Sequence, residues 1–292
     1  MSSRYGILIA FIIIFFSGCS LTESKKESDQ TDSQSGPKKS AIVKKTKSKI
    51  DSLTKAGFEI IDLHAHLKGG LTVDELLKHS KKTGIKYGIA ANCGVGFPIQ
   101  DDASLSEYYY SLKGYPVYVD MQAEGREWVN LFSPDSIAKF DYVFTDAMTF
   151  TDPNGKRTRL WMNDEVDIID PEVFMEFYVQ QIEKIMNNEK VNIYVNPTFL
   201  PEVIRDQYDE LWTDERTKRV AIALKNNNIA CEINARYMIP SAHFIKLAKE
   251  EGVKFTMGTN NGAADLGYLE YSLAMIDECK LSPNDFWKPE KK

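Results

Sequence analysis

The stretch FEIIDLHAHLKGGLTVDELLKHSKKTGIKYGIAAN, residues 58–92, decides the fold class of this chain. It opens with one short apolar run and closes with a second, YGIAAN. Between them, Thr72 and Glu75 form a capping box, which starts a helix, and Gly84 is a residue type that ends one. A strand, a helix and a second strand in this order predict two parallel strands joined by a helical crossover.

The same alternation continues to the end of the chain. Seven short apolar runs read as strands, at residues 58–64, 87–92, 116–122, 141–147, 191–197, 229–234 and 254–259. Helical patterns separate most of them, which predicts an α/β fold, a distorted (β/α)7 TIM-like barrel over residues 50–292. A doubly wound open sheet is the alternative, disfavoured because no glycine-rich dinucleotide fingerprint follows the first strand. Residues 149–170 lack periodicity and predict a large loop on the active-site face.

The N-terminus predicts export. Residues 1–18 contain Arg4 followed by an apolar core that is too short to span a bilayer comfortably, as in a signal peptide that is removed. The FSGC ending resembles a bacterial lipobox, which implies lipidation of Cys19, and Ser20 favours the outer membrane by the same resemblance. The alternative is an uncleaved membrane anchor. Residues 19–49, rich in Ser and Lys, predict a flexible tether.

The charge distribution excludes one class of partner. Residues 20–49 hold eight lysines against four acids and Arg4 adds one positive charge, so residues 50–292 carry −11 when the whole chain carries −6. A domain this acidic is not expected to bind nucleic acid through its phosphates. Three cysteines follow Cys19, an odd number that predicts free and mostly buried thiols rather than a disulfide framework.

Polar side chains gather at the C-terminal ends of the predicted strands. Alternation along the first strand places Ile61, Leu63 and Ala65 on one face, under the helices, and Asp62, His64 and His66 on the other, toward the barrel interior. The same reasoning on the other strands predicts one ring of polar side chains, formed by His64, His66, Glu124, Asp146, Asn196, Glu232 and Asn260. Two imidazoles at positions i and i+2 are able to turn toward one transition-metal ion.

Two of these segments resemble a known family. DLHAHL, residues 62–67, and GVKFTMGTNNG, residues 252–262, are similar to the motifs of the polymerase-and-histidinol-phosphatase (PHP) metallohydrolases. The resemblance implies a distorted seven-unit barrel, up to three metal ions and hydrolysis of phosphate esters. It carries over His64 and His66 from the opening motif and Glu124 as the bridging glutamate.

The chain also departs from the PHP pattern. Cys93, Asn196, Asn260 and Gly262 stand where the family has histidine, histidine, aspartate and histidine. Because an amide oxygen carries no charge, these changes favour one divalent ion, zinc or manganese, held by His64, His66 and Glu124, over three ions.

The remaining roles complete the prediction. Asp146 or Glu232 is the predicted general base, and Arg126 and Arg236 are predicted to hold an anionic small-molecule substrate together with Asn196 and Asn260. The sequence thus favours a lipid-anchored metal-dependent hydrolase and leaves its oligomeric state open. The alternative is a catalytically degenerate barrel that binds a sugar-like ligand. His79 and His243, the other two histidines, are predicted to be structural.

Overall fold

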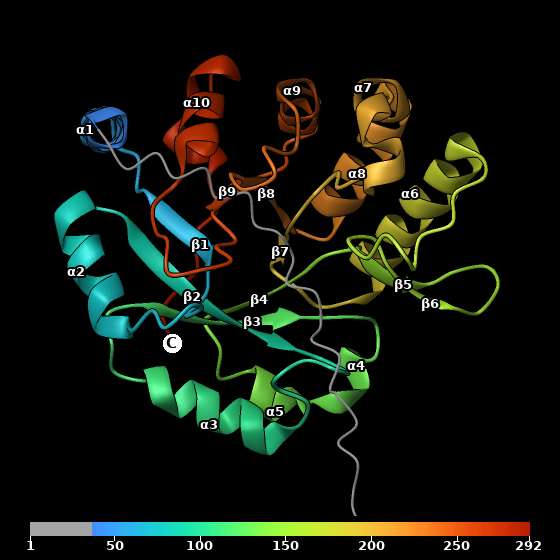
Figure 1. Ribbon diagram of the computed structural model, residues 1–292, viewed down its shortest axis with the longest axis horizontal. Coiled ribbons are helices and arrows are strands. Elements are labelled where there is room, and N and C mark those ends of the chain that lie inside the picture. The colour runs from blue at the N-terminus through green and yellow to red at the C-terminus, as the bar shows by residue number, and fades with distance from the viewer. Residues whose placement is uncertain (1–36) are drawn as a thin grey trace, which may run out of the picture.

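The computed structural model describes residues 37–292, with side chains from residue 46 onward. Its centre is a closed barrel of seven parallel strands in the order β1-β2-β3-β4-β7-β8-β9 (Figure 1). The strands are β1 (Ile61–Ala65), β2 (Lys86–Cys93), β3 (Tyr118–Ala123), β4 (Tyr142–Thr145), β7 (Ile193–Tyr194), β8 (Ala230–Asn234) and β9 (Phe255–Gly258). All seven predicted strands are present, so the predicted (β/α)7 barrel is confirmed and the open sheet is excluded.

Helices lie around the outside of the strands (Figure 1). They are α1 (Pro37–Lys55), α2 (Val73–Thr83), α3 (Asp102–Leu112), α4 (Trp128–Leu131), α5 (Pro134–Ile137), α6 (Pro171–Asn188), α7 (Tyr208–Leu211), α8 (Asp214–Asn226), α9 (Ala242–Glu250) and α10 (Glu270–Glu278), with 3-10 turns η1 (Glu202–Gln207) and η2 (Pro283–Asp285). Helix α2 begins at the predicted capping box of Thr72 and Glu75 and ends at Gly84, which takes the left-handed conformation that glycine adopts without strain.

The folded part of the chain begins earlier than the predicted domain boundary at residue 50, because helix α1 precedes it. It begins at Pro37, so residues 37–49 are helical although the sequence assigns them to the tether. Ile50 and Leu53 are buried, and Lys49 forms an ion pair with Asp277 of α10 (2.5 Å). Tertiary contacts with α10 therefore stabilise a segment whose composition alone favours disorder. The signal peptide, Cys19 and the rest of the tether lie outside the described residues.

The predicted loop at residues 149–170 contains a hairpin. Strands β5 (Thr149–Thr151) and β6 (Arg157–Arg159) pair in antiparallel fashion around a tight turn, closed by a hydrogen bond from the Gly155 N–H to the Asp152 carbonyl (3.0 Å). The strands have three residues each, too few for their alternation to show as periodicity in the sequence. The hairpin leads directly into Trp161.

The register of β1 shifts at its centre. Its pairing with β2 is irregular between Asp62 and Ala65. Ile61 and Leu63 pack in a cluster of residues from the barrel strands and Val195, directly after β7, which places it inside the barrel, whereas Ala65 packs in the outer cluster beneath the helices. The prediction that Ile61, Leu63 and Ala65 share one outer face is therefore wrong, because a bulge changes the face in mid-strand.

Asp120 is a buried acid inside the barrel. Its neighbour in register on β2, Ala90, belongs to the inner cluster, and neither carboxyl oxygen of Asp120 has a hydrogen-bond partner among the described residues. The hydroxyl of the neighbouring Tyr142 donates instead to the carbonyl of Leu63 (2.7 Å). Burial raises the pKa of Asp120 well above its usual value, which favours the protonated form of this carboxyl.

This raised pKa has a measurable consequence for stability. The folded state holds the proton on Asp120 more tightly than the unfolded state does. The free energy of unfolding therefore falls as the pH rises from the unfolded pKa of Asp120, near 3.8, toward its folded pKa. We expect urea unfolding to show that Asp120→Asn gains on the wild type by about 1.4 kcal/mol per pH unit in this window. The exposed Asp167→Asn is the control and should show no such trend. A difference between Asp120→Asn and wild type that stays constant as the pH rises from about 4 would contradict the assignment.

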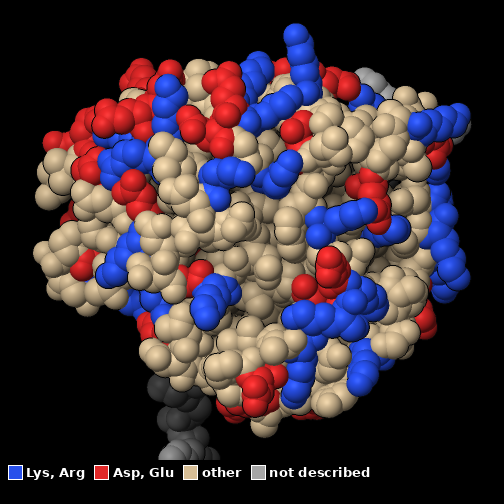
Figure 2. Space-filling model, turned by 180° about the vertical axis from the view of Figure 1, so that it is seen from behind, with Lys and Arg blue, Asp and Glu red and all other residues tan. Residues whose placement is uncertain are grey.

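Cys93, Cys231 and Cys279 are free and buried, as predicted. Among the described residues, no helix is both long and apolar enough to cross a membrane. Charges of both signs are interspersed over one face of the molecule, around a central area with few charged side chains (Figure 2).

Candidate functional site

His64 is held by a carboxylate from β8, which is separated from β1 by one strand, β9. Its Nδ1 lies 2.7 Å from Oε1 of Glu232 on β8, and both side chains are 1% exposed. The carboxylate oxygen accepts, so Nδ1 carries a proton and Nε2 points away from Glu232. That Nε2 is buried and has no partner among the described residues. The pair thus presents an oriented imidazole nitrogen, the arrangement that second-shell carboxylates produce at metal sites.

His66 has the same free atom for a different reason. Its Nδ1 lies 3.0 Å from the carbonyl oxygen of Ala90, which only accepts, so Nδ1 carries the proton. Its Nε2 is buried without a partner. Burial and the adjacent His64 lower the pKa of His66 well below its usual value, so the ring is neutral. The centroids of the His64 and His66 rings lie 5.2 Å apart, and neither Nε2 has a partner among the described residues.

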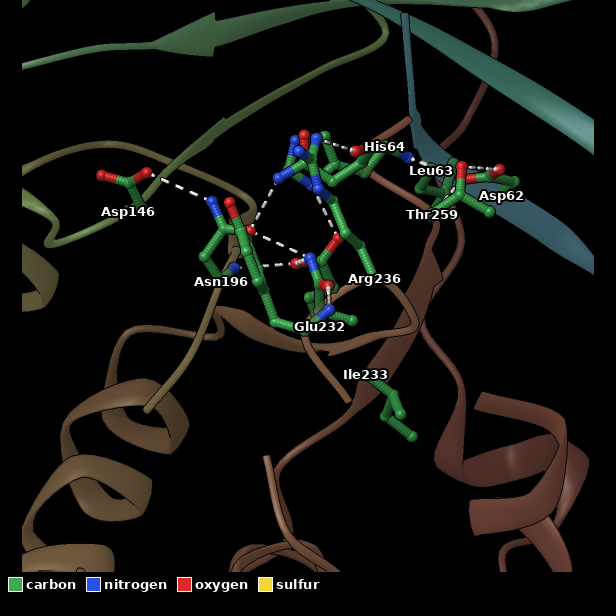
Figure 3. A network of polar contacts seen from close by, with 12 residues as sticks. Asp62, Leu63, His64, Asp146, Asn196, Glu232, Ile233, Arg236 and Thr259 are labelled. Atoms are coloured by element: carbon green, nitrogen blue, oxygen red, sulfur yellow. Dashed lines mark hydrogen bonds and ion pairs between the residues drawn. The ribbon is translucent and has the colours of Figure 1, made fainter. Parts of the chain in front are cut away.

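Glu232 connects His64 to a set of amides (Figure 3). Its Oε2 accepts hydrogen bonds from the backbone N–H of Asn196 (2.7 Å) and from Nδ2 of Asn234 (3.0 Å). Asn196 Oδ1 in turn accepts from Nδ2 of Asn234 (2.9 Å) and of Asn260 (3.0 Å). Because Glu232 is bound to His64 and does not line the cavity that contains Asp146, it positions His64 and is not placed to serve as the predicted general base.

The backbone conformation also favours asparagine at positions 196 and 260. Asn196 has a φ of 47° and Asn260 a φ of 44°, in the left-handed region that asparagine tolerates better than other residues with a side chain. Both follow the C-terminal ends of their strands, β7 and β9. The departure from the PHP pattern at these positions therefore coincides with a backbone shape that favours asparagine.

Glu124 and Asp146 are two neighbouring buried acids at the same end of the barrel. Glu124 follows β3 and accepts a hydrogen bond from Nδ2 of Asn92 (2.6 Å), while its other oxygen is buried and unpartnered. Burial and the nearby Asp146 carboxyl raise the pKa of Glu124 to about 8. Burial likewise raises the pKa of Asp146, which accepts from the Met148 N–H (3.0 Å) and from Asn196 Nδ2 (3.3 Å). Two adjacent acids with raised pKa values are a common feature of catalytic sites.

A cavity of about 270 Å³ opens over this end of the barrel. The predicted residues Glu124, Asp146, Asn196, Arg236 and Asn260 line it together. Its remaining lining residues are Lys68, Asn92, Phe97, Pro98, Gln122, Met148, Trp161 and Tyr237. The two histidines do not line the cavity themselves and are buried behind its wall.

Lys68 is the functional candidate that the sequence reasoning missed. It follows His66 by two residues, and no carboxylate among the described residues forms an ion pair with it. Burial and the neighbouring Arg236 guanidinium lower the pKa of Lys68. The signal in the sequence was its place directly after the two histidines, before the pair Gly69-Gly70.

Two residues that the sequence analysis placed at or near the site, Arg126 and Asp62, lie elsewhere. Arg126 forms an ion pair with Glu189 (2.9 Å) and donates to Thr145 Oγ1 (2.8 Å), and it does not line the cavity. Asp62 does not join the ring, because it accepts from the backbone N–H (3.0 Å) and hydroxyl (2.6 Å) of Thr259 at the end of β9 (Figure 3). These contacts fix the end of β9 against β1 and give Asp62 a structural role.

The other two histidines are engaged outside this cluster. His79 Nδ1 lies 2.8 Å from the hydroxyl of Tyr87, and the exposed His243 pairs with Asp214 (2.6 Å). Neither lines the cavity.

The chemical type of the donor atoms suits a transition metal, but their positions do not yet form a complete site. His64 Nε2, His66 Nε2 and Glu124 Oε2 are all buried and unpartnered, and imidazole with carboxylate is a set that zinc or manganese accepts. In the part of the chain that the structure describes, however, no three His, Cys, Asp or Glu side chains are grouped closely enough to hold an ion. The two histidines therefore offer ready ligands, and a third would have to move toward them.

Fold and site together define the class of this molecule: a parallel seven-stranded α/β barrel with histidines, acids and amides at the C-terminal ends of its strands. No protein-family model matches the chain, and a search of curated proteins finds no match.

Among solved structures, the chain is similar to a histidinol phosphate phosphatase of Lactococcus lactis subsp. lactis Il1403, determined with zinc, L-histidinol and phosphate. The match covers 80% of this chain and 100% of that one, with a TM-score of 0.58 and 15% identity. It supports the PHP-like fold that the motifs implied. An archaeal ribonuclease P with mature tRNA also matches, over 75% of this chain and 90% of that one at 13% identity, but its TM-score of 0.36 carries no argument.

Proposed function

We propose that the protein is a PHP-like hydrolase of a small anionic substrate, with a phosphate ester as the chemical class. The observation that carries this proposal is the pair of buried Nε2 atoms of His64 and His66, neither of which has a partner among the described residues. Leaving buried polar atoms without a partner is costly, and a bound cation would satisfy both. His64, His66 and Glu124 are the residues that would hold one divalent ion, zinc or manganese.

The ion, when bound, would polarise the ester and lower the pKa of a water molecule. Lys68 and Arg236 bind and orient the anionic group, since both line the cavity and neither forms an ion pair with a described residue. Asp146 accepts the proton of the attacking water, because it lines the cavity and its raised pKa makes it a stronger base than an exposed aspartate. Glu232 orients His64, because its contact with Nδ1 turns Nε2 away from the carboxylate.

Phosphate release tests this proposal directly. We expect the purified protein to hydrolyse small phosphate monoesters in the presence of zinc or manganese and to lose that activity after chelation. Activity should return when the metal is added back. If the protein releases no phosphate from any monoester in millimolar zinc or manganese, the hydrolase function is wrong.

A second candidate is a barrel that binds a small polar ligand without catalysis. It is favoured by the amides of Asn92, Gln122, Asn196 and Asn260, which line the cavity and offer uncharged hydrogen bonds. Gln122 Oε1 is buried without a partner among the described residues, so a ligand N–H or O–H group could satisfy it. This function predicts saturable ligand binding that chelation leaves unchanged.

We also propose that the chain is exported and anchored in the outer membrane by a lipid on Cys19. Support comes from the apolar N-terminal run, the FSGC ending and Ser20. Labelling of expressing bacteria with a palmitate analogue should mark the wild-type protein and not Cys19→Ala. A labelled Cys19→Ala protein would contradict the assignment.

A further inference from the structure

A second, larger cavity adjoins the site. Its volume is about 630 Å³, against about 270 Å³ for the site cavity. Both are lined by Arg236 and Tyr237, so the two cavities meet at these side chains. Pockets for organic ligands usually have volumes of about 300–1,000 Å³. The site cavity alone is therefore small for an organic ester, whereas the adjoining cavity has room for a substantial organic group.

The walls of the second cavity are largely apolar. Four aromatic rings line it, together with Leu200, Met238, Ile239 and Met275. Two of these rings have already used their hydroxyls: Tyr271 donates to the Pro240 carbonyl (2.6 Å), and Tyr208 accepts from the Ser241 N–H (3.2 Å). These tyrosines therefore offer ring carbon rather than a polar group to an occupant. The other two aromatic rings, Phe199 and Tyr237, pack edge to face with centroids 5.1 Å apart.

An apolar side chain stands exposed beside this cavity in an unusual conformation. Met238 is 64% exposed and has a φ of 53°, in the left-handed region that methionine rarely adopts. A non-glycine residue in this backbone region is strained, and such strain often occurs where a ligand binds. A ligand that covers Met238 would account for its exposure.

Two guanidinium groups and one exposed carboxylate, Glu278, line the second cavity, so positive charge prevails there. Arg236 lies over the ring of Tyr237 (5.6 Å) and Arg205 over the ring of Phe199 (5.9 Å). Neither arginine forms an ion pair with a carboxylate in residues 46–292. In a domain that carries −11, two arginines without an acidic partner favour an anionic ligand.

From these observations we infer that the substrate is amphiphilic: an ester whose phosphate occupies the site cavity and whose aromatic or branched apolar group occupies the second cavity. This inference rests on the proposed hydrolase function for the phosphate end. Arg236 lies at the junction and binds the phosphate, while Phe199, Tyr237 and Met238 contact the apolar group and determine specificity.

Binding of non-hydrolysable phosphonates tests the inference without requiring catalysis. We expect calorimetry on the full chain with zinc to show that benzylphosphonate binds at least about tenfold more tightly than methylphosphonate, because the ring is buried. Ala242→Phe adds a ring to the wall of the second cavity and should abolish this preference, with methylphosphonate affinity within about twofold of wild type. Val203→Phe is the matched control, because Val203 is 63% exposed and lies outside that cavity.

Met238→Asn provides a second variant should Ala242→Phe fail to fold. Asparagine tolerates the left-handed backbone and removes apolar surface, so the preference for benzylphosphonate should fall by about threefold or more. Equal binding of both phosphonates to the wild type overturns the inference and leaves anion binding in place. No binding of either phosphonate, together with no hydrolysis of phosphate esters, overturns the proposed function and the inference with it.

Discussion

Replacing His64 and His66 together with alanine is expected to remove bound metal and to lower phosphate-ester hydrolysis by at least about a thousandfold. Each ring contributes a buried Nε2 without a partner, and each is oriented by a hydrogen bond at Nδ1, to Glu232 and to Ala90. Loss of both nitrogens leaves Glu124 as the only remaining member of the proposed ligand set, which is too few for a divalent ion. Elemental analysis and phosphate release on the same preparations measure the two effects.

The control is His243→Ala. His243 is exposed and pairs with Asp214 at the surface, so its removal should change neither metal content nor activity. Full activity in the His64→Ala/His66→Ala variant would show that the hydrolytic site lies elsewhere. Metal retained at wild-type stoichiometry in that variant would show that the ion is held by other groups.

Glu232→Leu is expected to destabilise the fold by about 3–5 kcal/mol. The carboxylate accepts three hydrogen bonds, from His64 Nδ1, the Asn196 backbone N–H and Asn234 Nδ2. Leucine accepts none of them, so three buried donors lose their partner inside the barrel. Urea unfolding followed by tryptophan fluorescence measures the change.

The matched control is Glu107→Leu in α3. Glu107 is exposed, so this substitution should change stability by no more than about 0.5 kcal/mol. Glu232→Gln separates shape from charge, since it keeps the volume and one acceptor oxygen and should cost less than Glu232→Leu. If Glu232→Leu is as stable as Glu107→Leu, the network does not hold the barrel end together.

The barrel was predictable because its signals are local. Each strand is a short apolar run, and α2 is delimited by residues within its own ends, Thr72, Glu75 and Gly84. The gathering of Glu124, Asp146, Asn196 and Asn260 in one cavity followed from parallel strands, whose C-terminal ends lie at the same end of a barrel.

Other features were not predictable because they depend on contacts between distant segments. The bulge in β1 is a mismatch of pairing with β2 that the alternation of residues 61–65 does not reveal. The helical state of residues 37–49 depends on packing against α10. Arg126 forms an ion pair with Glu189, which is 63 residues away in the chain. The sequence predicts that this loop arginine binds substrate, but its guanidinium binds a carboxylate instead.

The sequence by itself determined the class of fold and the end of the barrel where polar groups meet, because strand alternation and helix caps act over a few residues. Only the tertiary structure decided what those polar groups are free to do. Glu232 binds His64 across 168 residues, which occupies the glutamate and leaves the imidazole Nε2 free. Whether a buried donor or acceptor already has a partner depends on which strands the closed barrel brings together, and no local pattern in the chain records it.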